Sequence, residues 1–190
     1  MKTHKLNIIF FITLPFIATI IVGTFVIAVM STMENKRLMD GTNVILSVPK
    51  AVGTFMKNHP TASFLPNDNI LDLLSADKLF PEQPLFTPWG GKIQATAFDD
   101  RSFRVYTMVP PSTCRKLSLY FGKYDFSDMG LVAMYANPQY TNTWATTFST
   151  TKRETPVKIE SACGAGTNTN VAIEFSFKRN SLESTTTTPL

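Results

Sequence analysis

The chain has 190 residues, of which 44% are apolar and 17% charged, with 18 basic and 14 acidic residues. Once a membrane segment is subtracted, the remainder is long enough for one compact domain and too short for two. The basic residues are scattered and do not form a face interleaved with aromatic residues. This pattern excludes the usual kind of nucleic-acid-binding surface, so we predict no nucleic acid partner.

The N-terminal segment from Leu6 to Met33 contains no charged residue and consists mostly of Ile, Phe, Val, Ala and Leu. It exceeds the roughly 20 residues that a helix needs to cross the hydrocarbon core of a bilayer. Pro15 and Gly23 would break a soluble helix, whereas membrane helices tolerate such residues. We therefore predict that residues 1–33 form a cytoplasmic stub and a transmembrane helix, with membrane lipid as its partner.

A cleaved signal peptide is the alternative for this segment. The apolar region of a signal peptide is usually about 7–15 residues long and ends at a small-x-small site. The run here is longer, and Ala28 to Ser31 makes a poor cleavage site. Lys2 and Lys5 precede the run without a neighbouring acid, which favours a cytoplasmic N-terminus and an exported C-terminal domain over residues 34–180.

The two cysteines, Cys114 and Cys163, both lie in this exported part, and neither belongs to a CxxC pair or a metal-ligand spacing. Two free thiols in the core are one possibility. An even number of cysteines in an exported domain favours a disulfide bond instead. A bridge closing a loop of about 50 residues is worth up to about 4 kcal/mol. We predict that the segment after Cys114 is a loop-rich region bounded by the bridge.

Residues 34–57 continue the helix with one apolar stripe, formed by Leu38, Thr42, Ile45, Val48, Val52 and Phe55. The stripe either packs against the rest of the domain or faces a neighbouring subunit, and the two uses are compatible. Gly41 and Pro49 interrupt it, so we expect a kink or a break there. Residues 58–60 end the helix.

The next stretch predicts a short helix and then a turn. Asp68 is a plausible N-cap, and the expected buried side consists of Ile70, Leu71, Leu74 and Leu79. Residues 81–88 read as extended, and Trp89-Gly90-Gly91 is a turn signal.

From Ile93 the apolar period becomes two, which predicts a hairpin of strands 93–97 and 103–109 that turns at Asp99-Asp100. Pro110-Pro111 stops the second strand. A helix capped by Ser112 or Thr113 is expected next, with an apolar side made of Cys114, Leu117, Leu119 and Phe121.

The remaining signals are weaker until the last strand. We predict strands at 131–136 and 157–159, a Thr-rich segment at 141–151 anchored by Trp144 and Phe148, a turn at 164–166, and a strand at 171–177. The Thr-rich tail, residues 181–190, lacks a packing face and is expected to be disordered. The fold class is therefore α+β, with a long N-terminal helix and an antiparallel sheet of four or five strands.

Catalytic chemistry is not indicated by the residues present. The only exported histidine, His59, stands at a helix end, and Asp99-Asp100 reads as a turn. Gly90-Gly91 lacks the spacing of a phosphate-binding loop. We predict that the protein is not an enzyme and has no cofactor, metal site or small-molecule substrate. Five aromatic residues in the bridged region form either a small core, the interpretation we favour, or a contact surface: Tyr120, Tyr124, Tyr135, Tyr140 and Trp144.

Three motifs occur in a characteristic order: Pro88-Trp89-Gly90-Gly91 opens the first strand, Val109-Pro110-Pro111-Ser112-Thr113-Cys114 ends the hairpin, and Ala162-Cys163 precedes the last strand. In this order they resemble type IVb pilins of the PilS kind, over about residues 30–178. The resemblance implies a helical spine with a sheet packed on its C-terminal half. It also implies a Cys114–Cys163 bridge around a variable surface region, pilin-like subunits or pilus and secretion machinery as partners, and a location in the bacterial inner membrane or a pilus.

The helix departs from that family. Its members have a Gly at the cleavage site before the apolar run and a Glu early in the mature helix, whereas no Gly precedes the run here and no acid lies between Met1 and Glu34. Three functions remain open: a pilus subunit of a minor or non-standard kind; a non-polymerising anchored component of a pilus or secretion machine; and an unrelated anchored periplasmic domain.

Overall fold

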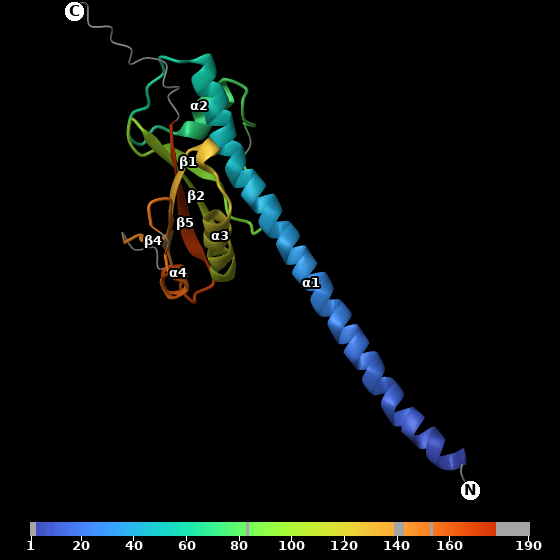
Figure 1. The fold of residues 1–190 in the computed structure, drawn as a ribbon. Helices are drawn as coiled ribbons and strands as arrows, with labels where there is room; N and C mark the ends of the chain where they lie inside the picture. Colours follow the sequence, from blue (N-terminus) through green and yellow to red (C-terminus); the bar gives the residue numbers. More distant parts are fainter. Residues whose placement is uncertain (1–2, 83, 139–142, 153, 178–190) are drawn as a thin grey trace, which may run out of the picture. The chain divides into compact units, whose positions relative to one another are not determined.

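The computed structural model describes residues 3–82, 84–138, 143–152 and 154–177, with the backbone alone over residues 3–30. The chain divides into two compact units, Met1–Met39 and Asp40–Leu190. The predicted tail, residues 181–190, lies outside the described residues. The elements, most of which Figure 1 labels, are in chain order α1 Thr3–Asn58, α2 Ile70–Ala76, β1 Gln94–Ala97, β2 Ser102–Val109, α3 Pro111–Lys123, the short 3-10 helix η1 Ser127–Met129, β3 Leu131–Asn137, β4 Ala145–Ser149, α4 Pro156–Cys163 and β5 Thr169–Ser176.

Helix α1 is continuous from Thr3 to Asn58 and ends at the predicted place. It runs through Gly41 and Pro49 without interruption, so of the predicted kink or break, the break is wrong. Gly41 and Pro49 are themselves buried, and Ile45 and Val48 are fully inaccessible. This packing outweighs the low helix propensity of Gly and Pro.

The predicted transmembrane helix falls almost entirely within residues 3–30, whose side chains lie outside the described part. Among the residues that are described in full, no helix has both the length and the apolar content required to span a membrane.

The unit that begins at Asp40 is built on one five-stranded antiparallel sheet with the order β1-β2-β5-β3-β4. The α+β class and the five strands agree with the sequence-based prediction. The last strand of the chain, β5, is the central one: Ala172 is the partner of Tyr106 on β2 and of Tyr135 on β3. Strands β2, β5 and β3 each pair with a strand that is far away in the sequence. The outer edge of β1 is paired with residues 67–69, and residues 85–86 pair with residues 92–93 just before β1.

The core lies on one face of this sheet. Phe103, Val105, Ile173 and Phe175 are at most 1% exposed, and Phe103 stacks on Phe175 with ring centroids 5.5 Å apart. The buried side chains of α1 and α3 complete the core: Ile45, Leu46, Val48, Val52, Leu117 and Phe121. The apolar stripe of α1 thus packs in the way the first of its two interpretations expects.

The two short helices before and after the hairpin begin differently from the prediction. The N-cap of α2 is Asn69, whose side chain accepts a hydrogen bond from the Leu71 N–H, and not Asp68. Asp68 instead accepts from the Leu65 N–H at 2.7 Å. Asp68 therefore stabilises the preceding turn, so the next residue is left to cap the helix.

Helix α3 begins at Pro111 with Pro110 as its N-cap and has no side-chain cap, so the prediction of Ser112 or Thr113 was wrong. Proline suits the first helical position because its missing N–H would be unpaired there in any case. Leu119 is 56% exposed, contrary to its predicted burial. Its place on the buried face is taken by Ser118, which lies four residues after Cys114 and three before Phe121.

Residues 157–159 belong to helix α4 and not to the predicted strand. Thr155 is the N-cap, its hydroxyl accepts a hydrogen bond from the Lys158 N–H, and Pro156 occupies the first turn. Thr155-Pro156 is a typical helix start, whereas the short apolar run that follows it is equally compatible with a strand. Ile159 is 6% exposed and Val157 is 78% exposed, as expected for opposite faces of a helix.

Candidate functional site

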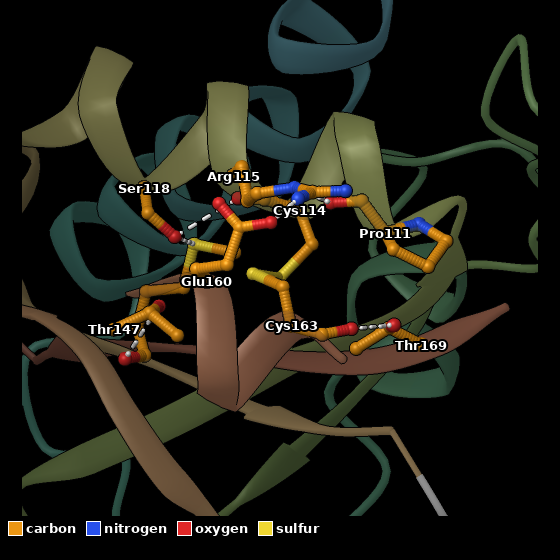
Figure 2. Close-up of a disulfide and its surroundings, with 9 residues drawn as sticks. Pro111, Cys114, Arg115, Ser118, Thr147, Glu160, Cys163 and Thr169 are labelled. Carbon is orange, nitrogen blue, oxygen red and sulfur yellow. Dashed lines mark hydrogen bonds and ion pairs between the residues drawn. A yellow bond between two sulfur atoms is a disulfide. The ribbon is translucent and has the colours of Figure 1, made fainter. Parts of the chain in front are cut away.

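Cys114 and Cys163 form a disulfide bond that joins α3 to the last residue of α4. Their Cα atoms are 5.8 Å apart, and both residues are fully buried. Figure 2 shows the bridge between the two helices and above the sheet. The two cysteines that the sequence predicts as partners are therefore placed as a bonded pair.

Polar contacts surround the bridge and hold both of its ends. Thr169 Oγ1 donates to the Cys163 carbonyl at 2.6 Å, and Ser118 Oγ donates to the Cys114 carbonyl at 2.9 Å (Figure 2). The Arg115 guanidinium pairs with the Glu160 carboxylate across the two helices. The two hydroxyl groups satisfy the backbone carbonyls of the bridged cysteines, and the ion pair joins the two helices beside the bridge.

The bridged region is regular structure, and the prediction that it is rich in loops is wrong. It contains most of α3, followed by η1, β3, β4 and α4. Gly164 then turns the chain from α4 towards β5 with φ +68°, and a Cβ atom there would lie 2.5 Å from Pro138 Cβ. Only glycine combines this backbone conformation with so close an approach.

An open groove of about 850 Å³ lies between α3, β4 and the start of α4. Its lining mixes apolar and charged side chains, among them Leu119, Tyr124, Phe148, Lys123, Lys152 and Glu154. Leu119 and Tyr124 are 56% and 48% exposed. Such a groove offers a contact surface of mixed character.

The four described members of the aromatic set do not form the small core that we favoured. Trp144 is 36% and Tyr124 is 48% exposed, and Tyr120 and Tyr135 are half-buried, while Tyr140 lies outside the described residues. Tyr120 and Tyr124 contact each other at the end of α3, with ring centroids 4.7 Å apart. Buried phenylalanines from β2, β5 and α3 fill the core instead, because their side chains carry no hydroxyl group to satisfy.

Tyr135 lies on the sheet face opposite the core, beside an ion pair between β2 and β5. Arg104 donates from Nε and Nη2 to Glu174 Oε2 at 2.9 and 2.8 Å, and the two side chains are 19% and 13% exposed. The guanidinium also lies 3.5 Å from the ring centroid of Phe98. Burial raises the pKa of the Tyr135 hydroxyl, and the negative charge of Glu174 adds to that effect.

The sequence contained a signal for this ion pair that we did not use. Arg104 and Glu174 occupy the outward positions of two strands with strict alternation, and they are direct partners in the register of β2 and β5. Opposite charges on two alternating strands indicate such pairing once the strand order is known. The sequence did not reveal that β5 is the neighbour of β2 in the sheet, because the two strands are far apart in the chain.

The remaining polar candidates have structural positions. His59 Nε2 lies 2.7 Å from Asp77 Oδ2, which links the end of α1 to the end of α2. Asp99 Oδ1 accepts hydrogen bonds from the Arg101 N–H, the Ser102 N–H and the Ser102 hydroxyl, as predicted for a turn residue. The Arg101 N–H, followed by the Ser102 contacts, holds the pKa of Asp99 below its usual value despite opposing desolvation.

Three comparisons relate the chain to known proteins. No family model matches it, and no curated protein matches it. Among solved structures, it is similar to a chain described as "Crystal structure of type IV b pilin from Salmonella typhi". The two share 21% identity, with 70% of this chain and 96% of that chain covered and a TM-score of 0.48.

Proposed function

We propose that the protein is a type IVb pilin-like structural subunit, minor or non-standard, of a type IV pilus or a related secretion or conjugation apparatus. The observation that carries this proposal is the arrangement around the bridge. The α1 stripe packs on an antiparallel sheet, and a disulfide ties α3 to α4 just before the central strand β5. The three sequence motifs that resemble type IVb pilins fall in the turn before β1, at the start of α3 and at the end of α4.

The proposal places the N-terminal run, residues 6–33, in the bacterial inner membrane as a single span, with the domain from residue 34 exported. A charge-free apolar helix of this length needs lipid or other apolar helices around it. Its proposed partners are therefore membrane lipid and the apolar helices of other pilin-like subunits. The role is structural and not enzymatic.

A second function is favoured by one specific feature of the sequence. No acidic residue lies between Met1 and Glu34, whereas the pilins that the chain resembles carry a Glu early in the helix. A subunit without this charge is suited to remain in the membrane as a non-polymerising binding or assembly component. The groove between α3, β4 and α4 would then be its contact surface.

Fractionation of cells that express the full chain tests both functions. The membrane and sheared-filament fractions are probed for the protein, and its N-terminal mass is measured in each. A filament subunit is expected in both fractions. Protein found with an intact Met1 only in membranes would overturn the filament function in favour of the second one.

A matched pair of variants tests the anchor itself. Ile20→Arg places a charge near the middle of the apolar run, which costs about 3 kcal/mol in membrane insertion, whereas Ile20→Leu preserves its apolar character. We expect Ile20→Arg to reduce the membrane-bound fraction and Ile20→Leu to leave it unchanged. Equal membrane retention of both variants would contradict the anchor.

A further inference from the structure

The loop that enters β1 makes a very close contact with α1 through Trp89. A Cβ atom at Gly41 would lie 2.2 Å from Cη2 and 2.4 Å from Cζ3 of the Trp89 indole. Any side chain at position 41 therefore requires the indole to move. Trp89 belongs to one of the motifs singled out in the sequence, yet the bridge and its groove give it no role.

The loop holds the indole from a turn that is fixed at both ends. The Thr87 N–H donates to the Gly91 carbonyl at 2.8 Å, and the buried Thr87 hydroxyl accepts from the Gly91 N–H at 3.2 Å. A Cβ atom at Gly91 would lie 2.0 Å from the Met108 carbonyl of β2. The turn is thus seated directly on the sheet, and Trp89 reaches α1 from a rigid base.

The burial of α1 begins at the residue that Trp89 contacts. The side chains from Ser31 to Arg37 are exposed, and Met39 is 58% exposed. Gly41 is buried, Thr42 is 1% exposed and Ile45 is fully buried. The second compact unit likewise begins at Asp40. Trp89 therefore lies at the first turn of α1 that this unit holds.

That turn depends on packing to remain helical. A glycine within a helix costs about 1 kcal/mol relative to alanine, and a proline costs about 3 kcal/mol. Gly41 and Pro49 enclose the segment between them. Pro49 also has no N–H to donate along the helix. The contact with Trp89 supplies packing at the glycine end of this segment.

We propose that the contact between Trp89 and Gly41, which we call the clasp, determines the position along α1 at which the helix begins to pack against the rest of the second unit. Release of the indole opens the first buried turn of α1, residues 40–46, and leaves the sheet folded. The turn 87–91 keeps its own hydrogen bonds when the indole leaves, so the opening is local. The inference rests on contacts within the second unit and does not depend on the proposed function.

The test uses the full chain in detergent micelles with Trp144→Phe as background. The sequence contains two tryptophans, so Trp89 is then the only fluorescent indole. Gly41→Ala should shift Trp89 emission to the red and increase its quenching by acrylamide. Amide exchange should become about tenfold faster over residues 40–46 and stay unchanged in β5.

Gly53→Ala is the matched control, because a Cβ atom there meets nothing within 4 Å on the same helix. We expect it to leave Trp89 emission unchanged and exchange unchanged or slower. Identical behaviour of the two alanine variants would overturn the clasp. Loss of protection in β5 together with residues 40–46 would also overturn it, since Trp89 would then belong to the cooperative core.

Trp89→Ala provides an independent measurement if Gly41→Ala does not fold. It removes the indole without crowding α1, and the clasp predicts faster exchange over residues 40–46 alone. In the Trp89→Ala background, Gly41→Ala should no longer destabilise, because the alanine meets no ring. A Gly41→Ala effect of equal size with and without Trp89 would contradict the contact.

Discussion

Two buried threonines on neighbouring strands differ in whether the hydroxyl has a hydrogen-bond partner, and this decides what each hydroxyl contributes to stability. Thr169 is fully buried and donates to the Cys163 carbonyl at 2.6 Å. Thr107 is 4% exposed, and its hydroxyl has no hydrogen-bond partner among the described residues. A buried hydroxyl without a partner costs free energy, whereas a bonded one contributes to stability.

Valine substitutions at these two positions should have different effects. Thr169→Val leaves the Cys163 carbonyl without its donor and should lower the free energy of unfolding by about 1–3 kcal/mol. Thr107→Val removes an unpaired hydroxyl and should be close to neutral or stabilising. Urea unfolding of the two variants measures the difference. Equal losses would mean that the Thr169 hydrogen bond contributes nothing specific.

Asp99 makes the stability of the hairpin turn depend on pH. Because its pKa is lower in the folded protein, the ionised form stabilises the fold above the unfolded pKa of about 3.9. This stabilisation is lost as the pH falls through the lower, folded pKa. Asp99→Asn should therefore be less stable than the natural chain at neutral pH, by no more than about 1 kcal/mol because the turn is solvated.

The difference between the two chains should narrow as the pH falls below about 4. Thermal unfolding at a series of pH values measures it. Asp100→Asn is the matched control, because the Asp100 carboxylate makes only a weak ion pair. It is 72% exposed and lies 4.0 Å from the 89% exposed Arg101 side chain. If the Asp99→Asn difference stays constant with pH, the charge of Asp99 does not stabilise the turn.

At the scale of elements, periodicity predicted the structure where one pattern extended over many residues. The hairpin, the last strand and the α1 stripe follow from it, because long alternation or long helical spacing admits one interpretation. Residues 157–159 are too short for that, and the decisive signal was the Thr155-Pro156 start of α4. The end of α1 was predicted, but not its continuity through Pro49, because tertiary packing overrides local propensity there.

The candidate site was predictable only in part. The bridge followed from the number of cysteines. The Arg104–Glu174 pair and the Trp89–Gly41 contact join segments that no local pattern relates, so they required the strand order and the path of the loop. Aromatic residue type alone did not distinguish core from surface: Phe121 is 1% exposed and Tyr124 is 48% exposed on the same helix.

The helical assignment of α4 has a simple test. In a strand, residues 157 and 159 would point to the same side, whereas in α4 they point to opposite sides. Ile159→Ala should lower the free energy of unfolding by about 2–4 kcal/mol, and Val157→Ala should change it by less than about 0.5 kcal/mol. Chemical denaturation measures both. Similar losses for the two variants would favour a strand.

At the scale of the whole molecule, the disulfide connects two cysteines, one on α3 and one on α4, that are separated by 49 positions in the sequence. Reduction should lower the free energy of unfolding by up to about 4 kcal/mol, because the unfolded chain regains the entropy of an open loop. Urea unfolding with and without reductant measures this loss. A Cys114→Ala/Cys163→Ala variant is the control, and its free energy of unfolding should not change with reductant. If the free energy of unfolding of the natural chain also stays the same on reduction, the bridge does not stabilise the fold.

The position of β5 has a consequence for the order in which the protein is made. Among the described residues this strand comes last in the sequence, yet in the sheet it lies between the β1-β2 hairpin and the β3-β4 pair. A chain that emerges with its N-terminus first therefore carries two incomplete half-sheets until residues 169–176 arrive. Non-local closure of this kind is slow. Synthesis thus leaves an interval in which the core is open, and the arrival of residues 169–176 is the event that ends it.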